Sequence, residues 1–212
     1  GTGIYMAYTG NSAEYGNATH CEYYTSQSDK SLGVVHTGAY PCNPSVGLYN
    51  GAPVVVTRDA FGGNQLLTSI YSKETASWTD IGDTLCADYH EAKVNGDTLY
   101  LMKNGDGNGD GTDSYVYTLS LTNSNATWTK LGTNAFIDNS AVPMNMFFDG
   151  GSIYITYQNG DTNLRDVYVK TLVNNKWRAV GTKVTRDGIL NMVGNVHNNT
   201  IYLVYGNSAS GI

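Results

Sequence analysis

The sequence predicts an all-β protein built from four-stranded antiparallel units that repeat along the chain. Four glycines recur 49, 50 and 49 residues apart, and three of them end a W-x-x-[I/L/V]-G motif. A fixed period of this length is typical of repeat architectures. Short runs rich in β-branched and aromatic residues alternate with Asn-Gly, Asp-Gly and Asn-Asn turns, whereas no segment keeps a helical period of 3.6 residues. The four glycines are Gly33, Gly82, Gly132 and Gly181.

Each repeat divides into four short strands joined by tight turns. In the best-defined unit, strand-like runs cover residues 142–148, 152–157, 165–172 and 176–181, and turns rich in Asn, Asp and Gly separate them. Runs of this length and spacing are typical of consecutive antiparallel hairpins. The second strand recurs at Ile4-Tyr5, Val54-Val55, Leu99-Tyr100, Ile153-Tyr154 and Ile201-Tyr202.

Four antiparallel strands in about 50 residues, repeated around an axis, describe the blade of a β-propeller. A solenoid is the alternative, but its rungs are normally shorter. The second strand occurs five times and the others four times, because the chain opens and closes on a second strand. We therefore predict five blades, with four as the alternative. The single propeller domain covers residues 1–212, in units 1–37, 38–86, 87–136, 137–185 and 186–212.

The motif tryptophans hold one position of the repeat. In the first copy Asp29 stands where the tryptophan is expected, ahead of Leu32-Gly33. Repetition at one place favours packing between blades. Stacking on sugar rings is the alternative, because a flat aromatic face fits the apolar face of a pyranose. The three residues are Trp78, Trp128 and Trp177.

Composition limits the classes of partner. Charged residues make up only 14% of the chain, and the net charge is −6. An acidic chain of this kind has no means of neutralising a line of phosphates, so we expect no nucleic-acid partner. No apolar run approaches the roughly 18 residues of a membrane span. Abundant Gly, Tyr, Asn, Thr and Ser favour a secreted or cell-surface protein. The chain starts without Met, and we expect any targeting segment to have been removed.

The three cysteines, Cys21, Cys42 and Cys86, fit no zinc-binding pattern. In a secreted protein the simplest arrangement is one disulfide and one free thiol. Cys42–Cys86 and Cys21–Cys42 are alternative pairs, and the absence of a disulfide is the third alternative.

One glycine-rich loop carries oxygen side chains at alternate positions, which suits a hard cation such as Ca²⁺. Tyr117 stands where an EF-hand would have its bidentate Glu. We favour a plain Gly/Asp-rich hairpin loop, with Ca²⁺ as the candidate cofactor in the alternative interpretation. The candidate ligands are Asp106, Asn108, Asp110 and Asp113.

Polar residues on the first strands point to the axis of the predicted propeller. Alignment of the repeats places Ser45, Glu91, Asn145 and Val193 at one position, and His90 precedes Glu91. His90 and Glu91 could support acid–base chemistry. The favoured alternative is that these residues only line a solvated channel. With tyrosines outside the repeat pattern, the candidate ligand-binding residues are Trp78, Trp128, Trp177, Tyr40, Tyr49, Tyr89, His90, Glu91 and Asn145.

The repeated L-Y … V-Y … W-x-x-[L/V]-G blade of about 49 residues resembles that of small secreted propellers, including the tachylectin-type five-bladed lectins. The resemblance covers the whole chain, but its motif is short and mostly structural. It implies glycan binding without catalysis at one shallow site per blade. It carries over no individual sugar-binding residue.

We therefore predict a non-catalytic, lectin-like propeller whose partner is a glycan or another extracellular ligand. No catalytic residue is assigned. One alternative is a polysaccharide-active enzyme, or a fragment of one, that uses Glu91 and a neighbouring Asp on the inner strands. The other is a protein–protein interaction or structural module of a larger surface protein.

Overall fold

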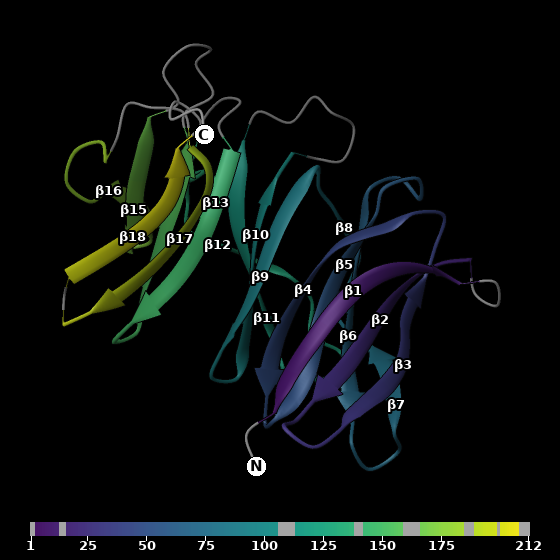
Figure 1. Ribbon diagram of the computed structural model, residues 1–212. Coiled ribbons are helices and arrows are strands. Elements are labelled where there is room, and N and C mark those ends of the chain that lie inside the picture. The colour runs from purple at the N-terminus through teal and green to yellow at the C-terminus, as the bar shows by residue number, and fades with distance from the viewer. Residues whose placement is uncertain are drawn as a thin grey trace.

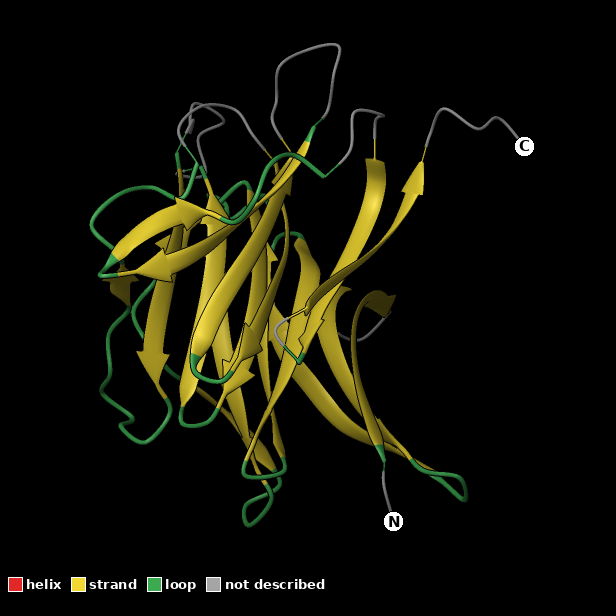
Figure 2. Cartoon of the chain, turned by 90° about the vertical axis from the view of Figure 1, so that its left-hand side faces the viewer, coloured by secondary structure: helices red, strands yellow, loops and turns green. Residues whose placement is uncertain are grey.

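The computed structural model describes residues 3–12, 16–105, 113–137, 142–158, 166–184, 189–198 and 200–207. These residues form β-strands and turns without any helix (Figure 2), as the sequence predicts. It follows that no described helix could cross a membrane.

The strands form five antiparallel sheets, each made of strands that are consecutive in the chain. The first sheet contains β1 (Ile4–Ser12), β2 (Gly16–Tyr24) and β3 (Asp29–Thr37). The second contains β4 (Pro41–Tyr49), β5 (Ala52–Asp59), β6 (Gln65–Ser72) and β7 (Ser77–Asp80), with β8 (Leu85–Cys86) paired to β6.

The third sheet contains β9 (Tyr89–Asn95), β10 (Thr98–Asn104), β11 (Ser114–Ser120) and β12 (Thr129–Leu131). The fourth contains β13 (Val142–Asp149), β14 (Ser152–Gln158), β15 (Val167–Val173) and β16 (Lys176–Ala179). The fifth consists of β17 (Ile189–His197) and β18 (Thr200–Asn207). The second, third and fourth sheets are therefore complete four-stranded blades.

In Figure 1 the first and second sheets lie on the right, the third in the middle, and the fourth and fifth on the left. Their innermost strands contact one another in the order β1, β4, β9, β13 and β17. In the first sheet β1, a second strand by sequence, holds the inner place beside β4. This radial stacking of antiparallel blades is the β-propeller arrangement that the repeat predicts.

The hydrophobic core is divided among the junctions between sheets. On β5 the side chains of Val54 and Val56 face the third sheet, and Val55 faces the first. All three are buried, because successive residues of a strand point to opposite faces and both faces of this sheet are covered.

The motif tryptophans and glycines meet across these junctions. Trp78 Nε1 donates to the carbonyl oxygen of Leu32 at 2.9 Å, so the indole of one blade lies over the Leu-Gly step of the preceding blade. Trp128 and Trp177 are buried in the next two junctions. This placement accords with packing between blades and leaves the faces of these two indoles closed to a ligand.

The three cysteines are unpaired, and Cys21 is buried between the first and second sheets. Neither of the predicted disulfide pairs is formed in the structure. Cys42 lies opposite Arg58, whereas Cys86 lies opposite Gln65, on different strand pairs of one sheet.

Candidate functional site

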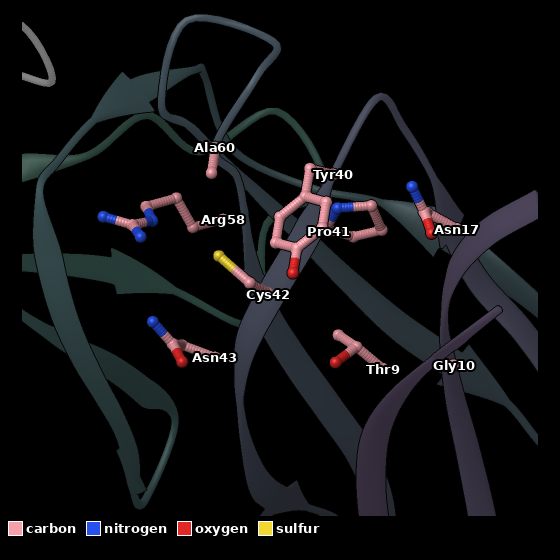
Figure 3. Close-up of a pocket in the computed structure, with 9 residues that line it drawn as sticks. All are labelled: Thr9, Gly10, Asn17, Tyr40, Pro41, Cys42, Asn43, Arg58 and Ala60. Carbon is pink, nitrogen blue, oxygen red and sulfur yellow. The ribbon is translucent and has the colours of Figure 1, made fainter.

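A polar pocket of about 550 Å³ lies between the first and second sheets (Figure 3). The end of β1 and the start of β2 form one wall, and β4 and β5 with their connecting loops form the other. In Figure 3 the Tyr40 ring and the Thr9 hydroxyl border the hollow, and Arg58 and Asn43 lie beyond Cys42. The lining residues are Thr9, Gly10, Asn17, Tyr40, Pro41, Cys42, Asn43, Arg58 and Ala60.

The Asp59 carboxylate at the end of β5 organises the rim of this pocket. It accepts hydrogen bonds from the backbone N–H groups of Ala39, Tyr40 and Gly62 at 3.0, 2.7 and 3.1 Å. Burial alone would raise the pKa of Asp59, but these N–H groups outweigh it and hold the pKa below its ordinary value. A Cβ on Gly62 would lie 2.4 Å from the carboxylate, so only glycine permits this approach.

The two loops held by Asp59 present an exposed aromatic pair. The rings of Tyr40 and Phe61 lie 5.0 Å apart at an angle of 50°. Tyr40 is 47% exposed and Phe61 is 77% exposed, unlike the tryptophans. Asn17 Nδ2 donates to the carbonyl of Ala39 at 3.1 Å, which ties the first sheet to the Tyr40 loop. The pair forms a supported apolar surface at the mouth of a polar hollow.

Arg58 is the only charged residue among the described residues of the pocket lining. Its guanidinium Nη1 donates to the backbone carbonyl of Asp88 in the third sheet, and its Nε is buried with no hydrogen-bond partner among the described residues. Arg58 is thus fixed at one end and offers cationic donors beside Cys42 and Asn43. The sequence pattern did not single it out.

His90 lies behind this wall rather than in the pocket. Burial, together with a smaller effect of the positive charge of Arg58, lowers the pKa of His90 to about 4. The ring is therefore neutral at neutral pH, and both ring nitrogens lack hydrogen-bond partners in the described part of the chain. Because neighbouring residues of a strand face opposite ways, His90 lies toward the second sheet and Glu91 toward the fourth. The structure separates this candidate acid–base pair.

Glu91 and Asn145 do come together, as the repeat alignment predicts. Asn145 Nδ2 donates to Glu91 Oε1 at 3.1 Å, and Lys93 Nζ lies 3.3 Å from the same oxygen. Asn145 Oδ1 accepts from the backbone N–H of Gly194 at 3.0 Å, so the cluster links β9, β13 and β17. Burial raises the pKa of Glu91, although Lys93 opposes it. Within the described residues, Glu91 Oε2 is buried without a hydrogen-bond partner.

The remaining predicted residues are dispersed. Tyr49 packs against the core between the second and third sheets, and Trp78 packs between the first and second. Burial and the charge of Glu91 raise the pKa of Tyr89 to about 12. Asp113 is exposed and accepts from the Tyr115 hydroxyl at 3.2 Å.

The other three residues of the predicted calcium loop, Asp106, Asn108 and Asp110, lie outside the described residues. Among the residues that are described, no group of three or more His, Cys, Asp or Glu side chains could hold a metal ion.

A second polar cluster, which the sequence did not reveal, joins the first two sheets. Ser69 Oγ donates to Asp80 Oδ1 at 2.6 Å and lies 2.8 Å from His36 Nε2. Because its hydrogen is directed to Asp80, the Ser69 hydroxyl accepts from the N–H of the His36 tautomer that carries its hydrogen on Nε2. The arrangement is therefore not that of a serine nucleophile activated by a histidine base. Ser69 is also fully buried, so the cluster is a structural joint.

No protein-family model and no curated protein sequence matches this chain. Solved structures do match. The SapL1 lectin in complex with alpha methyl fucoside superposes with a TM-score of 0.64 and 13% identity, over 96% of this chain and 68% of the lectin. The fold is a β-propeller. A polysaccharide lyase of family PL25, an ulvan lyase, superposes with a TM-score of 0.58 and 13% identity, over 96% of this chain and 63% of the lyase.

Glycoside hydrolases also share the fold. An exo-beta-1,3-galactanase from Clostridium thermocellum gives a TM-score of 0.55 at 12% identity, over 97% of this propeller and 52% of the enzyme. The GH43_1 enzyme from Xanthomonas citri complexed with xylose gives 0.51 at 12% identity, over 96% of this propeller and 78% of the enzyme. Identities this low establish the shared fold alone.

Proposed function

We propose that this propeller binds carbohydrate without catalysis, through the pocket between its first two sheets. The exposed Tyr40–Phe61 pair beside the polar hollow carries the proposal. A pyranose has an apolar C–H face and a rim of hydroxyls. An aromatic pair can cover the face while amide, hydroxyl and guanidinium groups pair with the rim.

The polar groups of the pocket suit hydroxyl recognition. Thr9, Asn43 and Arg58 provide donors and acceptors from three strands. Asp59 does not compete with a ligand for these groups, because its oxygens are occupied by backbone N–H groups. The pocket can therefore bind a polar ligand in a defined orientation.

The absence of a carboxylate pair in the lining favours binding over hydrolysis. Glycoside hydrolysis ordinarily needs two carboxyl groups about 5–10 Å apart. None of the described residues that line the pocket is an Asp or a Glu. The superposed lectin, lyase and glycosidase structures support carbohydrate as the ligand class without distinguishing a lectin from an enzyme.

The site is not repeated at the next junction. In the third sheet the strand register places Ala87 at the position of Tyr40 and Asn104 at that of Arg58. We therefore do not expect an equivalent site in every blade.

The test is a glycan-array screen followed by titration calorimetry with the best sugar, on the wild-type protein and on Phe61→Ala. Phe61 is 77% exposed, so its removal should leave the melting temperature unchanged while affinity falls roughly tenfold or more. Tyr202→Ala is the matched control, because Tyr202 is an exposed aromatic on the fifth sheet. Equal affinity of Phe61→Ala and wild type would overturn the proposed site.

Catalysis at Glu91 is the second candidate function. Its raised pKa and its unpartnered Oε2 are features of a general acid. Glu91→Gln should then abolish turnover of a polysaccharide that the wild type cleaves, with little change in folding. Undiminished turnover in this variant would eliminate the candidate.

We further propose that the protein acts outside the cell or at its surface. The second proposal, the alternative to the favoured plain hairpin loop, is that the loop around Asp113 binds Ca²⁺. Low charge content supports the first proposal, and the spacing of oxygen ligands supports the second. Loss of array binding on addition of EGTA, restored by Ca²⁺, would be the expected result for a calcium-dependent site.

A further inference from the structure

An apolar cavity of about 320 Å³ lies between the fourth and fifth sheets. It is separate from the sugar pocket, which lies between the first two sheets. The cavity is closed on one side by β15 and the segment after β16, and on the other by β18. Its lining residues are Val169, Val180, Val184, Ile201, Leu203 and Tyr205.

The wall from the fourth sheet has a direct counterpart in the third sheet. The N–H of Val180 donates to the carbonyl of Val169. In the third sheet Leu131 lies opposite Val116 in the same way. Val184 N–H donates to the Val167 carbonyl at 2.8 Å, and Phe136 N–H donates to the Ser114 carbonyl at 2.9 Å. These equivalences place Val169, Val180 and Val184 at the positions of Val116, Leu131 and Phe136.

The wall from β18 also has a counterpart, in β14. Thr200 and Ser152 each pair with the last residue of the preceding strand across a short turn. Counting from these residues places Ile201, Leu203 and Tyr205 at the positions of Ile153, Ile155 and Tyr157.

In the junction between the third and fourth sheets, the six counterparts surround one indole. Trp177 is 5% exposed within that cluster, and its ring centroid lies 5.9 Å from that of Phe136. Its Nε1 donates to the carbonyl of Leu131, the counterpart of Val180. Trp78 makes the equivalent bond to Leu32 two junctions earlier, between the first and second sheets. The same lining elsewhere in this chain thus encloses a tryptophan.

Gly181 ends the W-x-x-[I/L/V]-G motif of the fourth sheet, as Gly132 ends that of the third. It has φ +66°, close to the other motif glycines. A Cβ on Gly132 would lie 2.9 Å from Trp177 Nε1, and one on Gly82 would lie 3.1 Å from Trp128 Nε1. A Cβ on Gly181 would meet no described atom within 4 Å.

We infer that this cavity, which we call the Trp seat, binds the tryptophan of a β-hairpin that carries the W-x-x-[I/L/V]-G motif. The hairpin would extend the fifth sheet at β18, which pairs only with β17 among the described strands. Two residues of the cavity lining, Val184 at 40% and Tyr205 at 44%, are exposed, which accords with a surface that a further strand pair covers.

The occupant is a polypeptide hairpin of this repeat type, distinct from a second copy of the described sheets. The first sheet of a second copy carries Asp29 at the tryptophan position, and a carboxylate in this apolar cavity would be costly. The three tryptophans of the chain already lie in junctions of their own. The interface continues a junction that the chain already uses three times.

The test uses a fluorescein-labelled synthetic peptide with the sequence of residues 166–181, added to the 212-residue protein and followed by anisotropy. We expect saturable binding that weakens roughly tenfold or more when the tryptophan of the peptide is replaced by alanine. Equal binding of the two peptides, or binding of neither at millimolar concentration, would overturn the inference.

Two protein variants locate the binding. Val184→Lys places a charge at the Trp seat, whereas Val173→Lys changes a valine of similar exposure, 45%, on the same sheet but outside the cavity. Only Val184→Lys should weaken peptide binding. Equal effects of the two variants would contradict the assignment.

Indole itself provides a measurement that does not require the peptide to fold as a hairpin. Its addition should shift the methyl NMR signals of Val169 and Leu203 and leave those of Val54 and Val56 unmoved. Absence of shifts at saturating indole would overturn the Trp seat. Sedimentation that detects dimers of the chain, lost in Val184→Lys, would instead identify a second copy as the occupant and contradict the hairpin.

Discussion

The indole Nε1 of Trp177 lies 3.3 Å from the carbonyl oxygen of Leu131, the residue before the glycine that ends the preceding motif. The two residues belong to successive repeats. The tryptophan of one blade therefore covers the Leu-Gly step of the blade before it. The two ends of the W-x-x-[I/L/V]-G motif thus belong to two different interfaces: the tryptophan contacts the preceding blade, and the glycine contacts the tryptophan of the following blade. The regular spacing of the motif reflects the regular spacing of the blades.

Replacing Gly132 with alanine should destabilise the protein by about 2–4 kcal/mol. Gly132 has φ +88°, and an added Cβ would lie 2.9 Å from Trp177 Nε1. Gly181→Ala is the matched control, because φ is also positive there but no described atom lies within 4 Å of the Cβ, so we expect a loss of about 1 kcal/mol. Urea denaturation measures both. Equal losses would show that backbone strain, and not the neighbouring indole, determines the need for glycine.

Replacing Asp59 with alanine should abolish sugar binding and lower stability by about 1–3 kcal/mol. The variant leaves the N–H groups of Ala39, Tyr40 and Gly62 without their acceptor, so the Tyr40 and Phe61 loops lose their support. Calorimetry with the sugar found on the array and thermal melting test the two effects. Asp83→Ala is a control, since Asp83 accepts from the backbone N–H of Trp128 at another junction. Sugar affinity should survive that change, and a comparable loss would argue against a local role for Asp59.

The repeat is the part of this protein that the sequence predicts best, because each junction between blades requires the same residue types at the same positions. Trp78, Trp128 and Trp177 were predicted to pack between blades, and they lie in successive junctions. The strand order and the incomplete first and fifth sheets also follow from the positions of the repeated segments. The 49-residue period and the alternation of apolar and polar residues along each strand are enough to predict these features, because both can be read from the sequence directly.

The pocket was much harder to predict, because it depends on contacts that do not repeat. Tyr40 was singled out, but Arg58 was not, since a lone arginine in a strand has no distinguishing spacing. The sequence Asp59-Ala-Phe61-Gly-Gly contained a usable signal: an Asp followed by glycines is typical of a carboxylate that binds loop N–H groups. The pairing of Glu91 with Asn145 followed from the alignment, whereas the separation of His90 from Glu91 depends on the alternation of side chains along β9.

Acidification should destabilise the fold through His90. Its pKa is about 6.5 in an unfolded chain and about 4 in the folded protein, so below pH 6.5 the unfolded state binds the proton first. The contribution of His90 to the free energy of unfolding is fully present above pH 6.5. It falls by about 3 kcal/mol toward pH 4 and then levels off. Burial lowers the pKa of His36 as well and acts in the same direction. Urea denaturation of wild type and His90→Phe between pH 7.5 and 4 isolates the His90 part. A variant with the same pH dependence as wild type would refute it.

The three thiols should differ in reactivity. Cys21 is fully buried, and burial raises its pKa to about 11, so its thiolate is scarce and inaccessible at pH 8. Cys42 and Cys86 are partly exposed and should react with iodoacetamide in the folded protein, whereas Cys21 should react only after unfolding in guanidinium. Mass spectrometry of digested samples counts the labels at each position.

Because Cys42 lines the pocket, its alkylation should also block sugar binding, and Cys42→Ser should bind sugar both before and after the same treatment. Full sugar affinity in wild type labelled at Cys42 would mean that the ligand lies elsewhere. A disulfide detected between Cys42 and Cys86 would contradict the unpaired arrangement directly.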